Sequence, residues 1–335
     1  MKRIVIEKTG DPDVLGWGEG DEPRPGERDV VVKVAACGAC GHDLSDRAGL
    51  THIDMPHVLG HEVSGVVVQV GSKVHGFEVG DRVAGKQFTT CGMCLPCRSG
   101  HELNCEQKQF MYGGYAEYAA LPDDTIQRVP DNVPLEQAAV VACAVGTCLQ
   151  ALVDIGGLRP GERVVVTGAG GGLGLHGVQV ARALGAEVIA LTSSPEKVDP
   201  LKELGADHVV LGEGRYAQEL LEATGGRGVD VVLDNVGHPA VFDQCFRALV
   251  KRGRYILTGQ LYREKISLYP AFVFAKEAVI TGSGSTLMST FMRSMEMVAL
   301  GDVRPVIKTY PLSDAGSAHA DMEANRVFGR AVLVP

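Results

Sequence analysis

The sequence lacks the features that would place it in a membrane or on a nucleic acid. Its 335 residues include one tryptophan, and aromatic residues make up only 5%. No apolar run approaches the roughly 18 residues that a helix needs to span a bilayer. Lysine and arginine form no long cluster and the formal net charge is −9, so we expect neither a membrane nor a nucleic-acid partner.

An export signal is also absent from the N-terminal residues. Lys2 and Arg3 are followed by only three apolar residues, too few for the core of a signal peptide. We therefore expect a cytoplasmic protein. Apolar residues make up 45% and charged residues 22%, which is typical of a folded chain, and the length favours two domains.

Cysteine is abundant for such a chain, with nine residues, and four of them lie within fifteen positions: Cys91, Cys94, Cys97 and Cys105. Without an export signal, clustered cysteines are more typical of metal ligands than of disulfides. Four thiolates fill the tetrahedral shell of one zinc ion and leave no position for a substrate, so we expect a structural zinc site. Taken alone, the spacing also fits an iron–sulfur cluster, whereas two disulfides conflict with the expected compartment.

Short apolar runs and 43 glycines indicate an α/β fold. The first part of the chain reads as mostly β, with strands expected at 30–35, 63–70 and 81–84. After residue 160, strands and helices alternate, as in a doubly wound Rossmann sheet over 146–281. Expected there are strands at 163–167, 187–191, 209–211, 229–234, 254–258 and 279–282, and helices at 174–184 and 196–204. A helix at 288–300 and strands at 304–310 and 330–334 then return to the first part.

A glycine-rich turn follows the first strand of the predicted Rossmann domain. Its sequence is Gly168-Ala169-Gly170-Gly171-Gly172-Leu173-Gly174, and it opens a helix. The strict G-x-G-x-x-G pattern is absent because Ala169 occupies the place of its first glycine. The pattern Gly168-x-x-Gly171-x-x-Gly174 is present instead. Such a turn brings backbone N–H groups and a helix N-terminus to a pyrophosphate, so we expect Gly168, Gly171, Gly172, Leu173 and Gly174 to bind a dinucleotide.

The second strand of that domain lacks the acidic residue that usually binds a ribose 2′-hydroxyl. The chain has Thr192, Ser193 and Ser194 there, followed by Lys197. We expect these four residues to contact the cofactor. Because the site has no carboxylate and has a lysine nearby, it can accept a cofactor with a 2′-phosphate. NADP(H) is therefore favoured, and NAD(H) is the alternative.

Cys40, His61 and Cys143 are separated in sequence, and each one alone is more typical of a buried structural residue. Together, three such ligands would leave a fourth zinc position open, which is typical of catalytic zinc. Their spacing in the sequence does not by itself show that these three residues bind one ion.

Several motifs resemble the zinc-dependent medium-chain dehydrogenase/reductase superfamily, over essentially the whole chain. They are Gly60-His61-Glu62-x2-Gly65-x5-Gly71-x2-Val74, Cys37-Gly38-x-Cys40, the four-cysteine segment, Gly113-Gly114-Tyr115-Ala116-Glu117-Tyr118, and the turn at 168–174. The resemblance implies a GroES-like β-rich catalytic domain, formed by 1–145 and 282–335, and a Rossmann cofactor domain at 146–281. It also implies a homo-oligomer, dimer or tetramer, formed through the edge of the cofactor-domain sheet.

The resemblance also assigns roles to residues. It implies that Cys40, His61 and Cys143 bind the catalytic zinc, making two zinc ions per chain with the structural one. Asp43 would hydrogen-bond the ligand histidine, and Glu62 would approach the metal. Thr147 would contact the nicotinamide side of the cofactor and Arg330 its pyrophosphate.

The proton path departs from the family pattern. Many relatives carry Ser or Thr where this chain has His42, and some carry a relay histidine where it has Ser45. His42 either donates the proton to the substrate oxygen or only lines the cleft. For Cys37 we expect packing rather than metal binding, and for His57, His101, His176 and Cys148 a structural role.

The sequence therefore predicts a zinc-dependent alcohol dehydrogenase or carbonyl reductase acting on a small alcohol, aldehyde or ketone. Two alternatives remain open. The segments 142–147 and 282–285 resemble acryloyl-CoA-type enoyl reductases, and some members of the superfamily are crystallin-like, non-catalytic proteins that bind zinc and nucleotide.

Overall fold

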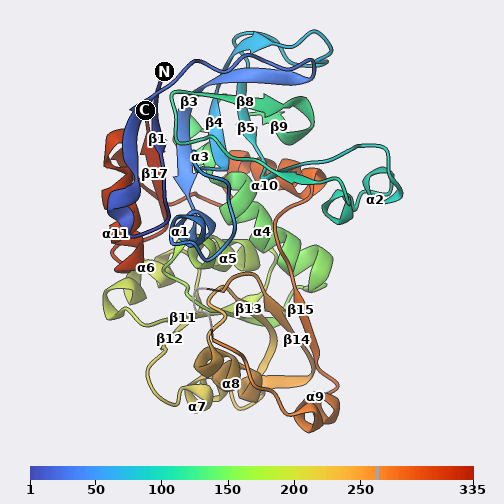
Figure 1. Ribbon diagram of the computed structural model, residues 1–335. Helices are drawn as coiled ribbons and strands as arrows, with labels where there is room; N and C mark the ends of the chain where they lie inside the picture. The colour runs from blue at the N-terminus through green and yellow to red at the C-terminus, as the bar shows by residue number, and fades with distance from the viewer. Residues whose placement is uncertain (261–263) are drawn as a thin grey trace. The chain divides into compact units, whose positions relative to one another are not determined.

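The computed structural model describes residues 1–260 and 264–335. Contacts within the chain divide it into two compact units (Figure 1). The first unit is formed by Met1–Cys143, Ser285–Leu300 and Pro305–Pro335, and the second by Ala144–Gly284 and Gly301–Arg304. Among the helices described, none is long and apolar enough to cross a membrane.

The second unit contains a parallel sheet of six strands in the order β12-β11-β10-β13-β14-β15. The strands are β10 (Arg163–Val166), β11 (Glu187–Thr192), β12 (His208–Leu211), β13 (Val229–Asp234), β14 (Leu249–Leu257) and β15 (Val279–Gly282). Central strand β13 is buried at every position, because helices cover both faces of such a sheet. The strand order reverses between β10 and β13, as in a Rossmann fold, so the predicted doubly wound sheet is confirmed.

Helical segments precede or connect these strands. They are α4 (Gly146–Leu149), η5 (Gln150–Ile155), α5 (Gly172–Ala183), η6 (Pro195–Lys197), α6 (Val198–Glu203), α7 (Ala217–Ala223), α8 (Pro239–Ala248) and α9 (Pro270–Lys276). The helix expected at 196–204 is therefore a short 3₁₀ turn followed by α6. The segments η4 (Val141–Val145) and η5 are π-helical, a feature that the sequence analysis did not anticipate.

The first unit is built on a mainly antiparallel sheet in the order β16-β17-β3-β4-β5-β9, with β8 also paired to β3. Its strands are β3 (Asp29–Ala39), β4 (Glu62–Val70), β5 (Arg82–Gly85), β8 (Tyr118–Pro122), β9 (Ile126–Arg128), β16 (Ile307–Pro311) and β17 (Arg330–Val334). Two small sheets pair β1 (Lys2–Val5) with β2 (Gly16–Glu19), and β6 (Phe88–Thr89) with β7 (Gln109–Phe110). The predicted β-rich part of the α/β fold is confirmed.

Short helices close this unit, and its apolar core lies on the large sheet. They are η1 (Pro12–Val14), α1 (Gly41–Arg47), α2 (Leu95–Arg98), η2 (Glu102–Asn104), η3 (Asp123–Thr125), α3 (Leu135–Ala139), α10 (Met288–Leu300), η7 (Leu312–Asp314) and α11 (Ala315–Glu323). Helix α10 has the predicted bounds, whereas β16 begins three residues later than the predicted strand at 304–310.

Strand β3 extends four residues beyond the strand expected at 30–35. Residues 37–39 continue strand β3, and only Cys40 leaves it as the residue that precedes α1. The reason is the C-terminal strand β17, whose Leu333 pairs with Cys37 and whose Ala331 pairs with Ala39. A partner almost 300 residues away supplies the backbone hydrogen bonds that local sequence could not reveal.

Candidate metal and cofactor sites

Four potential metal ligands converge in the first unit: Cys40, His61, Glu62 and Cys143. Cys40 comes at the end of β3, His61 directly before β4, Glu62 at the start of β4, and Cys143 within η4. All four are buried, and their donor atoms lie within 4.8 Å of one another. The structure therefore brings together the three ligands that the resemblance implied, with Glu62 beside them.

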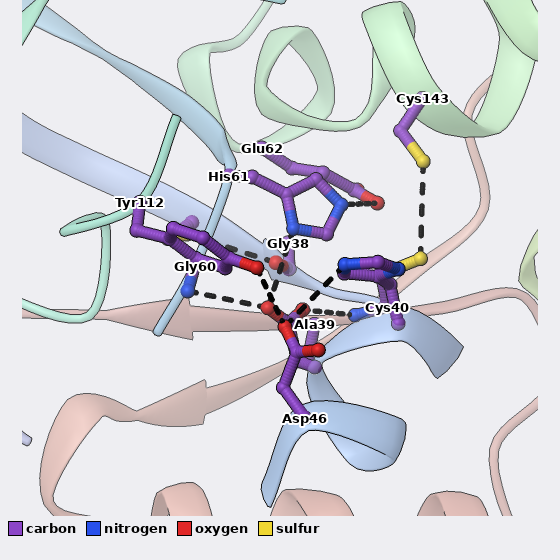
Figure 2. A network of polar contacts seen from close by, with 12 residues as sticks. Gly38, Ala39, Cys40, Asp46, Gly60, His61, Glu62, Tyr112 and Cys143 are labelled. Atoms are coloured by element: carbon purple, nitrogen blue, oxygen red, sulfur yellow. Dashed lines mark hydrogen bonds and ion pairs between the residues drawn. The ribbon is translucent and has the colours of Figure 1, made fainter. Parts of the chain in front are cut away.

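The distances within this cluster fit a tetrahedral ion. Sγ of Cys40 lies 3.9 Å from Sγ of Cys143, far beyond the roughly 2.05 Å of a disulfide (Figure 2). Two thiolates bound to one zinc ion at about 2.3 Å would lie about 3.8 Å apart. Nε2 of His61 faces Oε1 of Glu62 at 3.9 Å. Two sulfurs, an imidazole nitrogen and a carboxylate in a buried cluster form a donor set that suits zinc.

Asp43 positions the histidine and the first cysteine of this cluster. Its fully buried carboxylate lies 3.3 Å from Nδ1 of His61 and accepts hydrogen bonds from the backbone N–H groups of Cys40 and Gly60, at 2.8 and 3.2 Å. Burial alone would raise the pKa of Asp43, but His61 and the Cys40 N–H hold that pKa below its usual value. An ionised Asp43 keeps the proton of His61 on Nδ1. The unprotonated Nε2 is then the atom that can bind a metal ion.

The charges around Cys40 favour its thiolate, whereas the contact with Cys40 and burial raise the pKa of Cys143. The hydrogen bond with Cys143 and the nearby Arg330 cation hold the pKa of Cys40 well below its usual value. Burial raises the pKa of Glu62 to about 7, although Arg330 opposes this rise. A thiolate is the form of cysteine that binds metals, so the electrostatic environment agrees with the donor geometry.

Arg330 lies inside this cluster. The residue is 3% exposed, and Nη2 lies 3.3 Å from Oε1 of Glu62 and 3.7 Å from Sγ of Cys143. Nη1 donates to the backbone oxygen of Ala39. The contacts of Arg330 in the described structure are thus with the metal-ligand cluster, which the sequence analysis did not foresee.

His42 belongs to a neighbouring polar network. Its Nε2 lies 3.4 Å from the buried carboxylate of Asp46, which also accepts a hydrogen bond from the Tyr112 hydroxyl at 3.1 Å (Figure 2). The His42 ring packs on Phe110 at 4.7 Å and lies 5.8 Å from the His61 ring. Ser45 donates to the backbone oxygen of Gly41, one helical turn away, so its hydroxyl is engaged within α1. Asp46 lies four residues after His42 on α1, a spacing at which helical side chains meet, so helix periodicity could have indicated this pair. Nothing local links Tyr112 to them.

The four-cysteine segment also forms a compact cluster. The donor sulfurs of Cys91, Cys94, Cys97 and Cys105 lie within 4.8 Å of one another. Sγ of Cys97 is 4.0 Å from that of Cys91 and 3.4 Å from that of Cys94, and the Cys94 N–H donates to Sγ of Cys91. These spacings exceed a disulfide bond length and suit four thiolates around one ion. Cys37, by contrast, packs in the apolar core of the unit, as expected.

In the second unit the glycine-rich turn joins β10 to α5. Gly168 has φ +57°, a conformation that favours glycine, and α5 begins at Gly172. A side chain at Gly174 would collide with the backbone of Gly168, whose carbonyl carbon would lie 2.6 Å from the added Cβ. Gly174 therefore allows helix α5 to pack closely on the turn, the role of the third glycine in dinucleotide-binding turns. His176 and Cys148 make backbone contacts beside it, to Gly172 and Leu173.

A buried carboxylate holds the residue before this turn. Asp234, at the end of β13, accepts hydrogen bonds from the hydroxyls of Thr167 and Tyr255, both at 2.7 Å. Asn235 donates its side-chain N–H to the backbone oxygen of Thr167 at 2.9 Å. The carboxyl ends of β10, β13 and β14 are thereby tied together at the position where Rossmann folds bind their ligand.

The residues expected to select the cofactor lie after β11. Thr192 is buried and its hydroxyl accepts the N–H of Ser194, whereas Ser193 is exposed. Lys197 is 8% exposed and extends over the turn, since a Cβ at Gly170 would collide with Lys197 Cδ and would lie 3.4 Å from its Nζ. The lysine is thus placed against the glycine-rich turn. Thr147 is buried in α4.

Comparisons with known proteins agree with this architecture. Residues 26–131 match the family described as Alcohol dehydrogenase GroES-like domain, and residues 172–299 match Zinc-binding dehydrogenase. The acryloyl-coenzyme A reductase of Sulfurisphaera tokodaii is 32% identical over 342 residues, covering 100% of both chains. An alcohol dehydrogenase of Geobacillus stearothermophilus is 33% identical over 341 residues, covering 99% of both.

Among solved structures, one of an NAD-dependent alcohol dehydrogenase matches with a TM-score of 0.95 and 34% identity, covering 100% of both chains. These similarities extend over the whole length of the sequence, as the motifs indicated. The predicted resemblance is confirmed: the chain belongs to the zinc-dependent medium-chain dehydrogenase/reductase superfamily of NAD(P)-dependent oxidoreductases.

Proposed function

We propose that this chain is a zinc-dependent alcohol dehydrogenase or carbonyl reductase in which Cys40, His61 and Cys143 hold the catalytic zinc. The observation that carries the proposal is the buried cluster of these donors, with the two sulfurs 3.9 Å apart. Zinc bound there supplies a Lewis acid that lowers the pKa of an alcohol or polarises a carbonyl. A nicotinamide cofactor held at the glycine-rich turn 168–174 would supply or accept the hydride.

The residues around the cluster have distinct tasks in this proposal. Asp43 orients the His61 ring, and the carboxylate of Glu62 offers a further donor beside it. His42 carries the proton that the alcohol loses or the carbonyl gains. Since Nε2 of His42 faces Asp46, Nδ1 is the atom that exchanges the proton with the substrate side.

The test compares zinc content and turnover in the wild type and Cys40→Ser, using aldehydes and ketones with NADPH and NADH. We expect the variant to lose one zinc ion per chain and its carbonyl reduction, while it remains folded. A variant that keeps both full zinc content and full activity would overturn the assignment.

A second candidate is reduction of an activated carbon–carbon double bond. It is favoured by the 32% identity with an acryloyl-coenzyme A reductase over the whole chain. NADPH oxidation in the presence of acyl-CoA enoyl thioesters, measured beside the carbonyl panel, separates the two reactions. Turnover of the thioesters alone would replace the first proposal with this one.

We also propose a second, structural zinc ion bound by Cys91, Cys94, Cys97 and Cys105, and NADP(H) as the preferred cofactor. The support for NADP(H) is the absence of an acidic residue at the end of β11 and the position of Lys197 over the glycine-rich turn. In this proposal the first unit is a zinc-binding domain, with bounds 1–145 and 282–335. The second unit is a dinucleotide-binding domain, with bounds 146–281. Titration with NADPH and NADH tests the cofactor preference directly.

The assembly we propose is a homo-oligomer formed through the sheet edge at β15. This strand has one neighbour, β14, among the described strands, and apolar side chains near it are exposed: Tyr269 72%, Phe272 57%, Phe274 73% and Val279 52%. Exposed apolar patches beside an unpaired strand edge are typical of association sites. Light scattering of the wild type and of Phe274→Asp should show a larger species only for the wild type.

A further inference from the structure

Gly38 lies between the two members of a buried ion pair. The sheet order β17-β3-β4 places β3 between the strand that carries Arg330 and the strand that carries Glu62. Neighbouring strands are about 4.8 Å apart, so side chains that meet from the two outer strands must pass over the middle one. Arg330 and Glu62 do meet, with Nη2 and Oε1 3.3 Å apart. Gly38 is directly opposite Glu62 in the β3–β4 pair and opposite Val332 in the β3–β17 pair.

The space over Gly38 is filled by the Glu62 side chain. A Cβ at residue 38 would lie 2.9 Å from Cδ and 3.0 Å from Cβ of Glu62, and would collide with Oε2. Ordinary carbon–carbon contacts begin near 3.5 Å, so no side chain fits there while Glu62 keeps its position. The backbone does not itself require glycine, because Gly38 has ordinary strand conformation without a positive φ. The requirement is one of space alone.

The path across β3 determines where the Glu62 carboxylate lies. Glu62 is fully buried, and neither of its oxygens has a hydrogen-bond partner among the described residues. Its charge is balanced by Arg330, itself buried and 3.7 Å from Sγ of Cys143. If Glu62 were displaced, Arg330 would lose its carboxylate partner, and removing one member of a buried ion pair is strongly unfavourable.

We propose that Gly38 is a positioning residue of the metal site: its missing side chain lets Glu62 cross strand β3 to Arg330, and this crossing holds the carboxylate among Cys40, His61 and Cys143. The inference rests on the proposed function, because it takes these residues as metal ligands. It adds a residue that touches neither metal nor cofactor.

The test is a double-mutant comparison of zinc affinity, measured by competition with a chromophoric chelator. The variants are G38A, E62A and G38A/E62A. The matched control is G85A, a strand glycine of the same sheet where the nearest atom to an added Cβ is at 3.4 Å, an ordinary contact. We expect G38A to weaken one zinc site by about 10–100-fold, as loss of an outer-shell partner does, and G85A to leave both sites unchanged.

Adding G38A to E62A should not lower zinc affinity further, because the new methyl group occupies the space that the Glu62 side chain has left. The proposal is overturned if G38A lowers zinc affinity equally in the wild-type and E62A backgrounds. It is also overturned if G38A, introduced into the wild type, does not lower zinc affinity. If G38A alone fails to fold, recovery of folding in G38A/E62A to the level of E62A supports it, and failure to recover overturns it.

The same titrations with C40S distinguish failure of the proposed metal site from failure of the proposed role of Gly38. If C40S binds as many zinc ions as the wild type, with the same affinities, the proposed metal site itself is wrong. If C40S loses one zinc ion while G38A keeps wild-type affinity, the metal site stands and only the role of Gly38 fails.

Discussion

The carboxylate of Asp43 lies 3.3 Å from Nδ1 of His61 and simultaneously accepts the backbone N–H of Cys40. One buried anion thus positions two of the proposed metal ligands, one at the end of β3 and one at the start of β4. Because Asp43 is the third residue of α1, it also satisfies an N–H group at the start of that helix. Local helix capping and metal-site geometry depend on the same side chain.

Asp43→Asn should weaken zinc binding without unfolding the chain. The amide keeps the shape of the carboxylate but loses the charge that holds the proton on Nδ1 of His61, so we expect about 10–100-fold lower zinc affinity. Chelator competition measures this loss. Asp243→Asn, which removes a surface ion pair with Arg247, is the control and should change nothing. Unchanged affinity in Asp43→Asn would show that the contact with His61 is not needed for metal binding.

Cys94→Ser should remove the second zinc ion and leave the catalytic one. Three remaining thiolates hold the ion less firmly, and the segment from 91 to 105 has little apolar core to replace it. Elemental analysis should give one zinc ion per chain, and thermal unfolding should show a lower Tm. Cys245→Ser alters a buried thiol outside both clusters and should keep both ions. Two zinc ions in Cys94→Ser would refute the structural site.

Lys197→Ala should discriminate between the two cofactors. The lysine lies over the glycine-rich turn, so its loss should raise the Kd of NADPH about tenfold, or about 1.4 kcal/mol, and that of NADH less. Isothermal titration of both cofactors gives the comparison. Lys202→Ala, in α6 with a side chain 55% exposed, serves as the control. An equal effect on both cofactors would argue against a 2′-phosphate contact.

His319 should make stability depend on pH. It is fully buried, its Nε2 contacts the Tyr115 hydroxyl at 3.0 Å, and burial lowers its pKa to about 4, with Asp43 opposing and Arg47 assisting this shift. The unfolded chain binds this proton near pH 6.5, but the folded chain binds it only near pH 4. The contribution of neutral His319 to the free energy of unfolding is therefore fully present above pH 6.5. As the pH falls from 6.5 to 4, the free energy of unfolding decreases by an amount on the order of 3 kcal/mol.

Denaturant titrations from pH 7.5 to 4 measure this dependence. His319→Gln should flatten the slope in that window, whatever its own cost in stability. His208→Gln, which alters a histidine with a side chain 43% exposed, should leave the slope as in the wild type. If all three proteins lose stability in parallel, His319 is not the group responsible.

Much of the fold could be predicted because its signals are local. The strand at 229–234, the strand at 279–282 and the helix at 288–300 have the bounds that apolar patterning indicated. The π-helical stretch around α4 could not be predicted, since its residues are almost continuously apolar and give no period to follow. Strand β3 was read as too short because its last three residues are held by β17.

The sequence by itself determined the four-cysteine segment and the strand–glycine turn–helix unit, because in both the groups that must meet are within a few residues of one another. Covalent geometry then limits how far apart they can be. Only the tertiary structure decided that Arg330 faces Glu62 and that Gly38 must leave room between strands. Those contacts depend on strand order and register, which join residues from distant parts of the chain.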